Sequence, residues 1–153
     1  MEQISEYLFT TEEQAIIARS KAEGSYMKAP NRQATNLNEK QWAQVRTRAF
    51  REWFGDWENC PDEASKVRDA NGEPLVVYHG SRENFYEFKR WTDGLINSGH
   101  FFSPDRKNAS EYGGNIYDVY LNLRNPLEVD AQGANFSSIE YGGEKVAASD
   151  LGN

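Results

Sequence analysis

The dipeptide Asn71-Gly72 constrains the fold of this chain more than any other short feature. Both residues tolerate positive φ, and they lie between two segments that favour strands, so they predict a tight hairpin turn. The second arm reads LVVYHGS, from Leu75 to Ser81. Pro74 is expected at the beginning of this strand or on a sheet edge, because it has no amide hydrogen to donate to a central ladder. The strand therefore delivers His79 to the edge of a hydrophobic layer.

The length of 153 residues suits one domain with a single core. The 17 basic and 24 acidic residues give a net charge of −7, which disfavours nucleic acid as a partner because non-specific affinity for it is electrostatic. Apolar runs are far shorter than the ~20 residues that span a bilayer, and Met1 does not begin a signal peptide, so we expect no membrane partner. Cys60 is the only cysteine, which excludes an internal disulfide and fits a cytoplasmic protein.

Residues 1–35 are predicted to form a short helix and a linker in front of the domain. Thr10 and Glu13 have the spacing of a capping box, and helix-favouring residues continue to Gly24, where the helix should end. The next dozen residues include a proline and several small polar residues without periodicity, as is typical of a linker. We therefore expect the compact domain to comprise residues 36–153.

Residues 38–54 are predicted to form one helix with an aromatic face, and Asn38 suits its N-cap position. Apolar residues recur behind this cap at steps of three and four, which predicts that they pack in the core. They are Trp42, Val45, Ala49, Phe50, Trp53 and Phe54. The arginines of the segment are expected on its solvated faces: Arg46, Arg48 and Arg51.

Three further elements are predicted in the second half of the chain. A short strand is expected at residues 84–88. Ser103 suits the N-cap of a short helix that ends near Tyr112, because a proline follows it at the first helical position. Residues 117–124 alternate between apolar and polar side chains, which predicts a half-buried strand. From residue 131 onward the sequence is small and polar, with glycine pairs.

Several common catalytic and binding motifs do not occur in the sequence. His79, His100 and Cys60 do not have the spacing of zinc ligands. The glycine-rich turns that hold phosphates and the Gly-x-Ser-x-Gly nucleophile motif are also missing. A metal-independent ribonuclease with the two histidines as acid and base is an open alternative, although the acidic net charge argues against it.

Three short motifs follow one another in an order that resembles a known family. They are VVYHGS at residues 76–81, GHFFS at residues 99–103 and ASEY at residues 109–112. The series is similar to the motifs Tyr-His-Gly-Ser/Thr, Gly-Ile-Tyr-Phe and Ala-x-x-Tyr of ADP-ribosyltransferases in the diphtheria-toxin and poly(ADP-ribose) polymerase-like branch. With QVRTRAFREWFGDWEN and VYLNLRNPLEVD, the chain resembles more closely the ART-PolyVal type, which occurs in large polyvalent proteins of phages and conjugative elements. The resemblance covers residues 37–151.

This resemblance implies an α+β fold of the ADP-ribosyltransferase type. Two small, mostly antiparallel sheets would face each other across an NAD cleft, with helices preceding and flanking them. The implied activity is the transfer of one ADP-ribose unit from NAD to a macromolecular acceptor, expected to be a protein. A phage or another mobile element would encode such an enzyme.

The resemblance also implies roles for individual residues. His79 and Tyr112 would be catalytic, with the imidazole anchoring a ribose hydroxyl and the phenol ring stacking on nicotinamide. The backbone of Gly80 would approach the nicotinamide amide closely. Phe101 stands where the family usually has tyrosine. The full set of implied NAD-binding residues is His79, Gly80, Ser81, Gly99, Phe101, Phe102, Ser103 and Tyr112; no metal is implied.

The reaction also requires a carboxylate that stabilises an oxocarbenium-like transition state and orients the acceptor. In the family this residue lies on or beside a late strand, between segments of the Tyr-Asp-Gly-Val and Gln-Ile-Lys-Ser types. Neither segment occurs here, so the resemblance implies a domain truncated at its C-terminus. Glu140 and Glu144 are the nearest carboxylates, in a glycine-rich segment predicted as a flexible loop. The alternative hypothesis is a catalytically inactive or truncated module of a larger polyvalent protein that binds nucleotide or protein.

Overall fold

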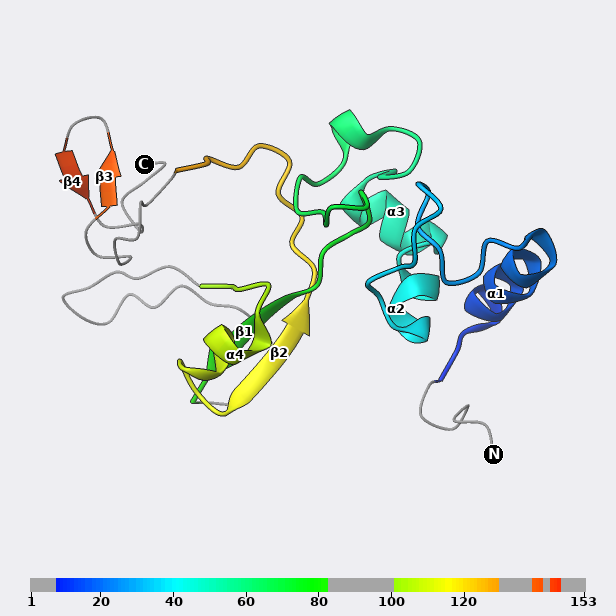
Figure 1. The fold of residues 1–153 in the computed structure, drawn as a ribbon, viewed down its shortest axis with the longest axis horizontal. Coiled ribbons are helices and arrows are strands. Elements are labelled where there is room, and N and C mark those ends of the chain that lie inside the picture. Colours follow the sequence, from blue (N-terminus) through cyan, green and yellow to red (C-terminus); the bar gives the residue numbers. More distant parts are fainter. Residues whose placement is uncertain (1–7, 83–100, 130–138, 142–143, 147–153) are drawn as a thin grey trace. The chain divides into compact units, whose positions relative to one another are not determined.

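The computed structural model describes residues 8–82, 101–129, 139–141 and 144–146 (Figure 1). The described elements are helices and short strands, which confirms the α+β class. In chain order they are α1 (Thr11–Glu23), α2 (Glu39–Gln44), α3 (Arg48–Phe54), a 3₁₀ turn (Pro61–Glu63), β1 (Val77–Ser81), α4 (Arg106–Ser110), β2 (Asn115–Val119), β3 (Ile139–Tyr141) and β4 (Glu144–Val146).

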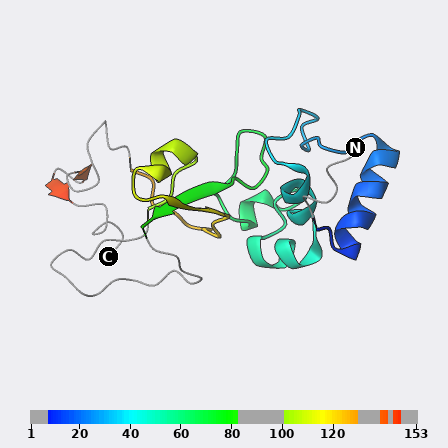
Figure 2. The same cartoon turned by 90° about the horizontal axis from the view of Figure 1, so that it is seen from below.

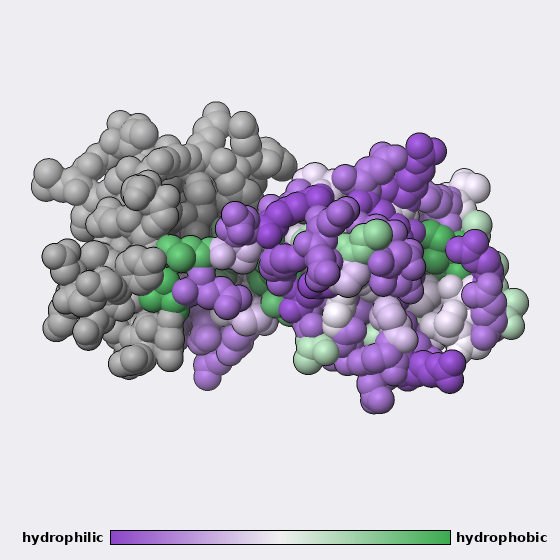
Figure 3. Space-filling model, turned by 90° about the horizontal axis from the view of Figure 1, so that it is seen from above, coloured by the Kyte–Doolittle hydropathy of each residue, from purple (hydrophilic) through white to green (hydrophobic). Residues whose placement is uncertain are grey.

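The chain divides into two compact units. Unit 1 comprises Met1–Val76 and Val119–Arg124, and unit 2 comprises Val77–Asp118 and Asn125–Asn153. The boundary expected at residue 36 stays a prediction, and each unit is described by itself below. Among the described residues no helix is long and apolar enough to span a membrane. Hydrophilic residues cover most of the coloured surface seen in Figure 3.

Helix α1 begins and ends where the sequence predicts. Thr10 is its N-cap and forms a capping box with Glu13, and Gly24 ends the helix in the left-handed conformation with a φ of 76°. Glu13 is buried and also accepts a hydrogen bond from Lys40 at the start of the next helix. Burial raises the pKa of the Glu13 carboxyl, but the hydrogen bonds from Lys40 and Thr10 outweigh it and hold the pKa below its ordinary value.

The prediction of one helix over residues 38–54 is wrong, because two helices form. Asn38 is confirmed as the N-cap of α2, since its side chain accepts from the amide of Gln41 at 2.8 Å. Thr47 then takes an extended conformation and becomes the N-cap of α3. Its hydroxyl donates to the carbonyl of Gln44 at 2.8 Å and accepts from the amide of Phe50 at 3.3 Å. These local bonds compete with the continuous helical ladder.

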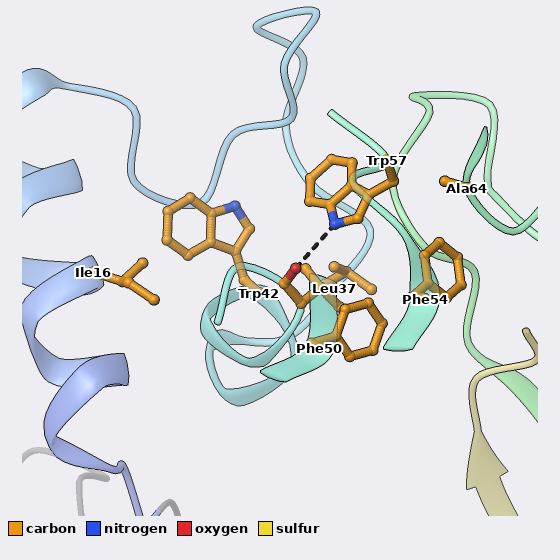
Figure 4. Packing of buried hydrophobic residues seen from close by; sticks show 8 residues of the cluster. Ile16, Leu37, Trp42, Phe50, Phe54, Trp57 and Ala64 are labelled. Atoms are coloured by element: carbon orange, nitrogen blue, oxygen red, sulfur yellow. Dashed lines mark hydrogen bonds between the residues drawn. The ribbon is translucent and has the colours of Figure 1, made fainter. Parts of the chain in front are cut away.

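The core of unit 1 is built where α1, α2 and α3 meet (Figure 4). The indole Nε1 of Trp57 donates to the carbonyl of Val45 at 2.9 Å inside this core. Trp53 and Ala49 were predicted to pack in the core; they are exposed instead, with Trp53 at 48%, because the break before α3 rotates them outward. The buried cluster consists of Ile16, Leu37, Trp42, Val45, Phe50, Phe54, Trp57 and Ala64.

The predicted turn at Asn71-Gly72 is confirmed. Gly72 has a φ of 82°, and an antiparallel bridge between Arg68 and Pro74 closes the turn. Glu73, directly after the turn, is fully buried and pairs with Arg46 at 2.8 Å. The prediction that Arg46 is solvated is therefore wrong. Burial lowers the pKa of the Arg46 guanidinium, although the Glu73 carboxylate counteracts this.

The strand predicted over residues 117–124 ends early, because β2 stops at Val119. The following residues belong to unit 1, where Ser65 binds their backbone. The Ser65 hydroxyl donates to the carbonyl of Leu121 at 2.6 Å and accepts from the amide of Leu123 at 3.0 Å. Ser65, with the Lys66 amide that donates to the Leu123 carbonyl at 2.7 Å, thus binds backbone groups that a longer β2 would offer to a neighbouring strand.

The described part of unit 2 contains two small sheets. Strands β1 and β2 form one of them, and α4 packs on β1 (Figures 1 and 2). Strands β3 and β4 form an antiparallel pair in which Ile139 is opposite Val146 and Glu140 is opposite Lys145. The prediction of a flexible loop around Glu140 and Glu144 is therefore wrong for these strands.

Candidate functional site

The motif residues of β1 lie beside residues 101–103. Tyr78 and Ser103 exchange two backbone hydrogen bonds, with N···O distances of 2.7 and 2.9 Å, and so form an antiparallel bridge. This bridge fixes the register between His79 and Phe102 on either side of it. Ser103 is not the predicted helix cap, because Asp105 caps α4 by accepting from the amide of Lys107. The bridge holds the Ser103 backbone against β1, two residues before the cap.

The His79 ring is oriented by the neighbouring segment. Its Nδ1 lies 2.7 Å from the carbonyl oxygen of Phe101. A carbonyl can only accept, so Nδ1 carries a proton, and in the neutral form of the ring the lone pair lies on Nε2. The ring of Phe102 lies beside the imidazole, with the centroids 5.2 Å apart and the planes at 45°. Position and tautomer of His79 are thus set by two residues of the second motif.

Phe101 also joins the second motif to the third. Its ring is nearly parallel to that of Tyr112, with the centroids 6.3 Å apart and the planes at 12°. Tyr112 follows α4 in a turn, where its amide donates to the carbonyl of Ala109 at 3.1 Å. Tyr112 is 51% exposed, an unusual value for a large aromatic side chain that packs against another ring. His79 and Tyr112 are therefore both in contact with Phe101.

Two glycines allow β1 to run very close to α4 and the turn after it. A Cβ built on Gly80 would lie 1.7 Å from the carbonyl oxygen of Ala109. One built on Gly113, whose φ is 154°, would lie 2.1 Å from the carbonyl carbon of Ser81. The missing side chain of Gly80 is thus required by packing within unit 2. Gly113 was not singled out from the sequence, although its place in a glycine pair after a short helix is a recognisable signal.

A charged pair lies at the outer side of these elements. Arg106 of α4 and Asp118 of β2 are 3.2 Å apart, and the guanidinium lies 5.9 Å from the centre of the Tyr78 ring. Both charged side chains are more than 40% exposed, so the pair adds little to stability. Within the described ranges no group of three or more His, Cys, Asp or Glu residues comes together as a metal site.

Some of the predicted residues cannot be placed against this arrangement. Gly99 and His100 lie outside the described residues, as does the strand expected at residues 84–88. Glu140 and Glu144 belong to β3 and β4, and the register assigns them to different cross-strand pairs. Glu144 is opposite Tyr141. The described geometry therefore unites the three motifs through His79, Phe101 and Tyr112.

Comparison with known proteins agrees with this grouping. A family model described as ADP-ribosyltransferase in polyvalent proteins matches residues 69–150, just over half of the chain. The matched range begins at the Asn71-Gly72 turn and includes all three motifs and the strands β3 and β4. No curated protein and no solved structure matches the chain. The chain belongs to the family of ADP-ribosyltransferases in polyvalent proteins.

Proposed function

We propose that the protein is a mono-ADP-ribosyltransferase that moves ADP-ribose from NAD to a protein acceptor in a cytosol. We also propose that a phage or another mobile element encodes it, in keeping with the polyvalent proteins that give the family its name. The observation that carries the proposal is the contact of both His79 and Tyr112 with Phe101, inside the range that the family model matches.

The two nearly parallel rings offer flat faces between which a planar ligand can stack. A ring inserted between Phe101 and Tyr112 needs about 7 Å between their planes, which is two carbon contacts of about 3.5 Å. The centroid distance of 6.3 Å is an upper limit on the present spacing of the planes, so the rings must separate by at least about 0.7 Å to admit nicotinamide. The exposure of Tyr112 makes this movement inexpensive, because its outer face has few packing contacts to lose. Nicotinamide would thus be held by stacking on both faces.

The orientation of His79 suits the binding of a ribose. With its proton on Nδ1, the neutral imidazole accepts a hydrogen bond at Nε2, and a ribose hydroxyl is a suitable donor. The carbonyl of Phe101 fixes the imidazole while the ring of the same residue fixes one wall of the stacking site. Phe101 therefore sets the distance between the ribose contact of His79 and the proposed stacking site. Gly80, Ser81, Phe102 and Ser103 complete the proposed NAD-binding set, together with Gly99 from the family motif.

In the proposed reaction, the bond between the nicotinamide nitrogen and C1′ of the ribose breaks, and nicotinamide leaves with the electron pair. An acceptor nucleophile then forms a bond to C1′ and loses its proton. A carboxylate would stabilise the positive charge that develops on the sugar. Glu140 and Glu144 are the candidates for this role. They belong to different cross-strand pairs, and separate substitutions distinguish their roles.

Incubation of the full chain with NAD labelled on the adenosine tests this proposal. We expect label on an acceptor protein and release of nicotinamide, both lost in His79→Ala and Tyr112→Ala. Leu127→Ala is the matched control, because Leu127 in unit 2 has the same 51% exposure as Tyr112. Separate Glu140→Gln and Glu144→Gln variants should lose activity unequally.

Two results would count against these expectations. NAD binding without transfer or hydrolysis would contradict the enzymatic proposal and support the inactive binding module. A loss of activity in Leu127→Ala equal to that in Tyr112→Ala would show that shortening an exposed side chain of unit 2 disturbs the protein in general.

A further inference from the structure

Unit 1 contains a cleft of about 710 Å³ that lies between α1, the loop of residues 25–34, and α2 and α3. Its lining residues all precede the range that the family model matches. The two carboxylates in the lining are Glu23 and Glu58. Cations outnumber them: Arg19, Lys28, Arg32, Arg46 and Arg51.

Two of the five cations are neutralised within the protein. Arg46 pairs with the buried Glu73, which lies outside the lining. Arg51 pairs with Asp56 and with Glu58, both at 2.7 Å. Because Glu58 is paired with Arg51, the charge of one of the two lining carboxylates is already neutralised. Glu23 is then the one lining carboxylate without such a pair in the described part of the chain.

The remaining three cations are exposed. Arg19 lies on α1, and Lys28 and Arg32 lie in the loop. None of the three forms an ion pair with a carboxylate among the residues that the structure describes. Three cations against one carboxylate give the cleft a positive charge in a chain whose net charge is −7. This local reversal of sign favours an anionic ligand.

The backbone of the loop shows that the position of Arg32 is specified. The amide of Ala29 donates to the carbonyl of Gln33, and that of Arg32 donates to the carbonyl of Ala29, both at 2.9 Å. Arg32 occupies the left-handed region with a φ of 68° at the end of this tight turn. Glycine is the usual residue at such a position, because other side chains are strained there. An arginine at a strained backbone position on a cleft supports a functional use of its side chain.

The loop is also held in place without a ligand. The carbonyl of Lys28 accepts from Trp42 Nε1 at 3.0 Å and from Arg46 Nη2 at 3.2 Å. Asn31 donates to the side chain of Asn71 at 3.0 Å, which ties the tip of the loop to the neighbouring turn. A ligand therefore meets a preorganised loop, which reduces the entropy lost on binding.

We propose that this cleft binds a small phosphate-bearing ligand through Arg19, Lys28 and Arg32. Its volume lies within the range of about 300–1,000 Å³ that is usual for small-molecule sites. Arginine side chains match the geometry of phosphate oxygens through paired donors. The overall negative charge disfavours a long nucleic acid. Trp42 is only 1% exposed, so its indole offers no face on which a base could stack.

Calorimetric titration of the full chain with inorganic pyrophosphate tests this inference. Arg19→Gln should weaken binding by about three- to tenfold without changing the melting temperature. Arg32→Gly should weaken binding to a similar degree and also raise the melting temperature, because glycine relieves the strained backbone. Arg48→Gln removes an exposed cation that lies outside the cleft and should bind as the wild type does. Saturating ADP-ribose should not displace pyrophosphate, which separates this site from the proposed NAD site.

Three results would overturn the inference. The first is an absence of binding to the wild type at millimolar pyrophosphate. The second is equal weakening in Arg48→Gln, which would indicate general electrostatic attraction. The third is tighter binding of an acidic peptide without phosphate, or of a single-stranded oligonucleotide with affinity that rises with length, since either would assign the cleft to another class of ligand.

Discussion

Replacing Gly80 with alanine should destabilise unit 2 locally, although alanine normally favours a strand over glycine. The added Cβ would lie 1.7 Å from the Ala109 carbonyl oxygen and 2.7 Å from the carbonyl carbon. The first contact is 1.3 Å short of the 3.0 Å that real Cβ atoms observe. Both atoms are backbone, so no side chain can rotate away, and α4 itself must move from β1.

The magnitude follows from two opposing effects. Alanine in place of glycine in a strand gains about 0.5–1 kcal/mol from reduced backbone entropy in the unfolded chain. Overpacking of a tight interior contact costs about 1–3 kcal/mol, and a contact between two backbone segments belongs at the upper end. We therefore expect a net loss of about 2 kcal/mol, which is about a 30-fold increase in local opening.

Hydrogen exchange is the suitable assay, because the two units need not unfold together. In Gly80→Ala the amides of β1 and α4 should exchange about 30-fold faster, while those of α3 in unit 1 stay unchanged. Gly114→Ala is the matched control, because a Cβ on Gly114 meets nothing within 4 Å. Exchange in β1 as slow as in the wild type would refute the close approach of α4.

Three predictions concern unit 1, each measured by urea unfolding with circular dichroism. Glu73→Ala should cost about 3–5 kcal/mol because it leaves Arg46 buried without a counter-ion, and an added Arg46→Met should recover much of the loss; no recovery would argue against the pair. Trp57→Phe should cost about 1–3 kcal/mol because the buried Val45 carbonyl loses its donor, and a neutral effect would contradict this bond. The folded-state pKa of Glu13 lies below the unfolded value of about 4.3. Its ionised carboxylate therefore stabilises the fold fully above pH ~4.3, and this stabilisation is lost as the pH falls through the folded-state pKa. The wild type should therefore lose more stability than Glu13→Gln between pH 7 and pH 3, and equal losses would contradict this coupling.

Local signals predicted the ends of elements well where a side chain binds its own neighbouring backbone. The capping box at Thr10 and the glycine turn at Gly72 were both predicted from their spacing. The same kind of interaction caused the errors. Thr47 begins a helix that the apolar pattern did not separate, because a period of 3.6 residues continues across a short break and does not reveal it. At the second error, Asp105 caps α4 in place of the predicted Ser103, two residues earlier.

Long-range contacts were less predictable. The burial of Arg46 depends on Glu73, which is 27 residues away and joins it only after the turn has formed. The predicted strand stops at Val119, and the backbone after it binds Ser65, which is more than 50 residues earlier in the sequence. Alternating hydrophobicity indicates which residues are half-buried, but it does not say whether a strand or a side chain will bind their backbone.

For the candidate site, the order of the motifs predicted which segments lie together, but it did not predict how. Phe101 proved to be the link, since its carbonyl binds His79 and its ring stacks on Tyr112. The missing side chain of Gly80 is required by Ala109, while the approach of its backbone to a ligand stays a prediction. Such a contact depends on the path of two backbones and leaves no periodic signal in the sequence.

The binding of nicotinamide between Phe101 and Tyr112 can be measured by titrating NAD and ADP-ribose into the full chain and into Tyr112→Ala. Stacking of a flat ring on an aromatic side chain contributes about 1–3 kcal/mol, so NAD should bind about 5- to 140-fold more weakly to the variant. ADP-ribose has no nicotinamide, and its affinity should stay the same. Equal weakening of both ligands, or no NAD binding to the wild type, would contradict the proposed stacking site.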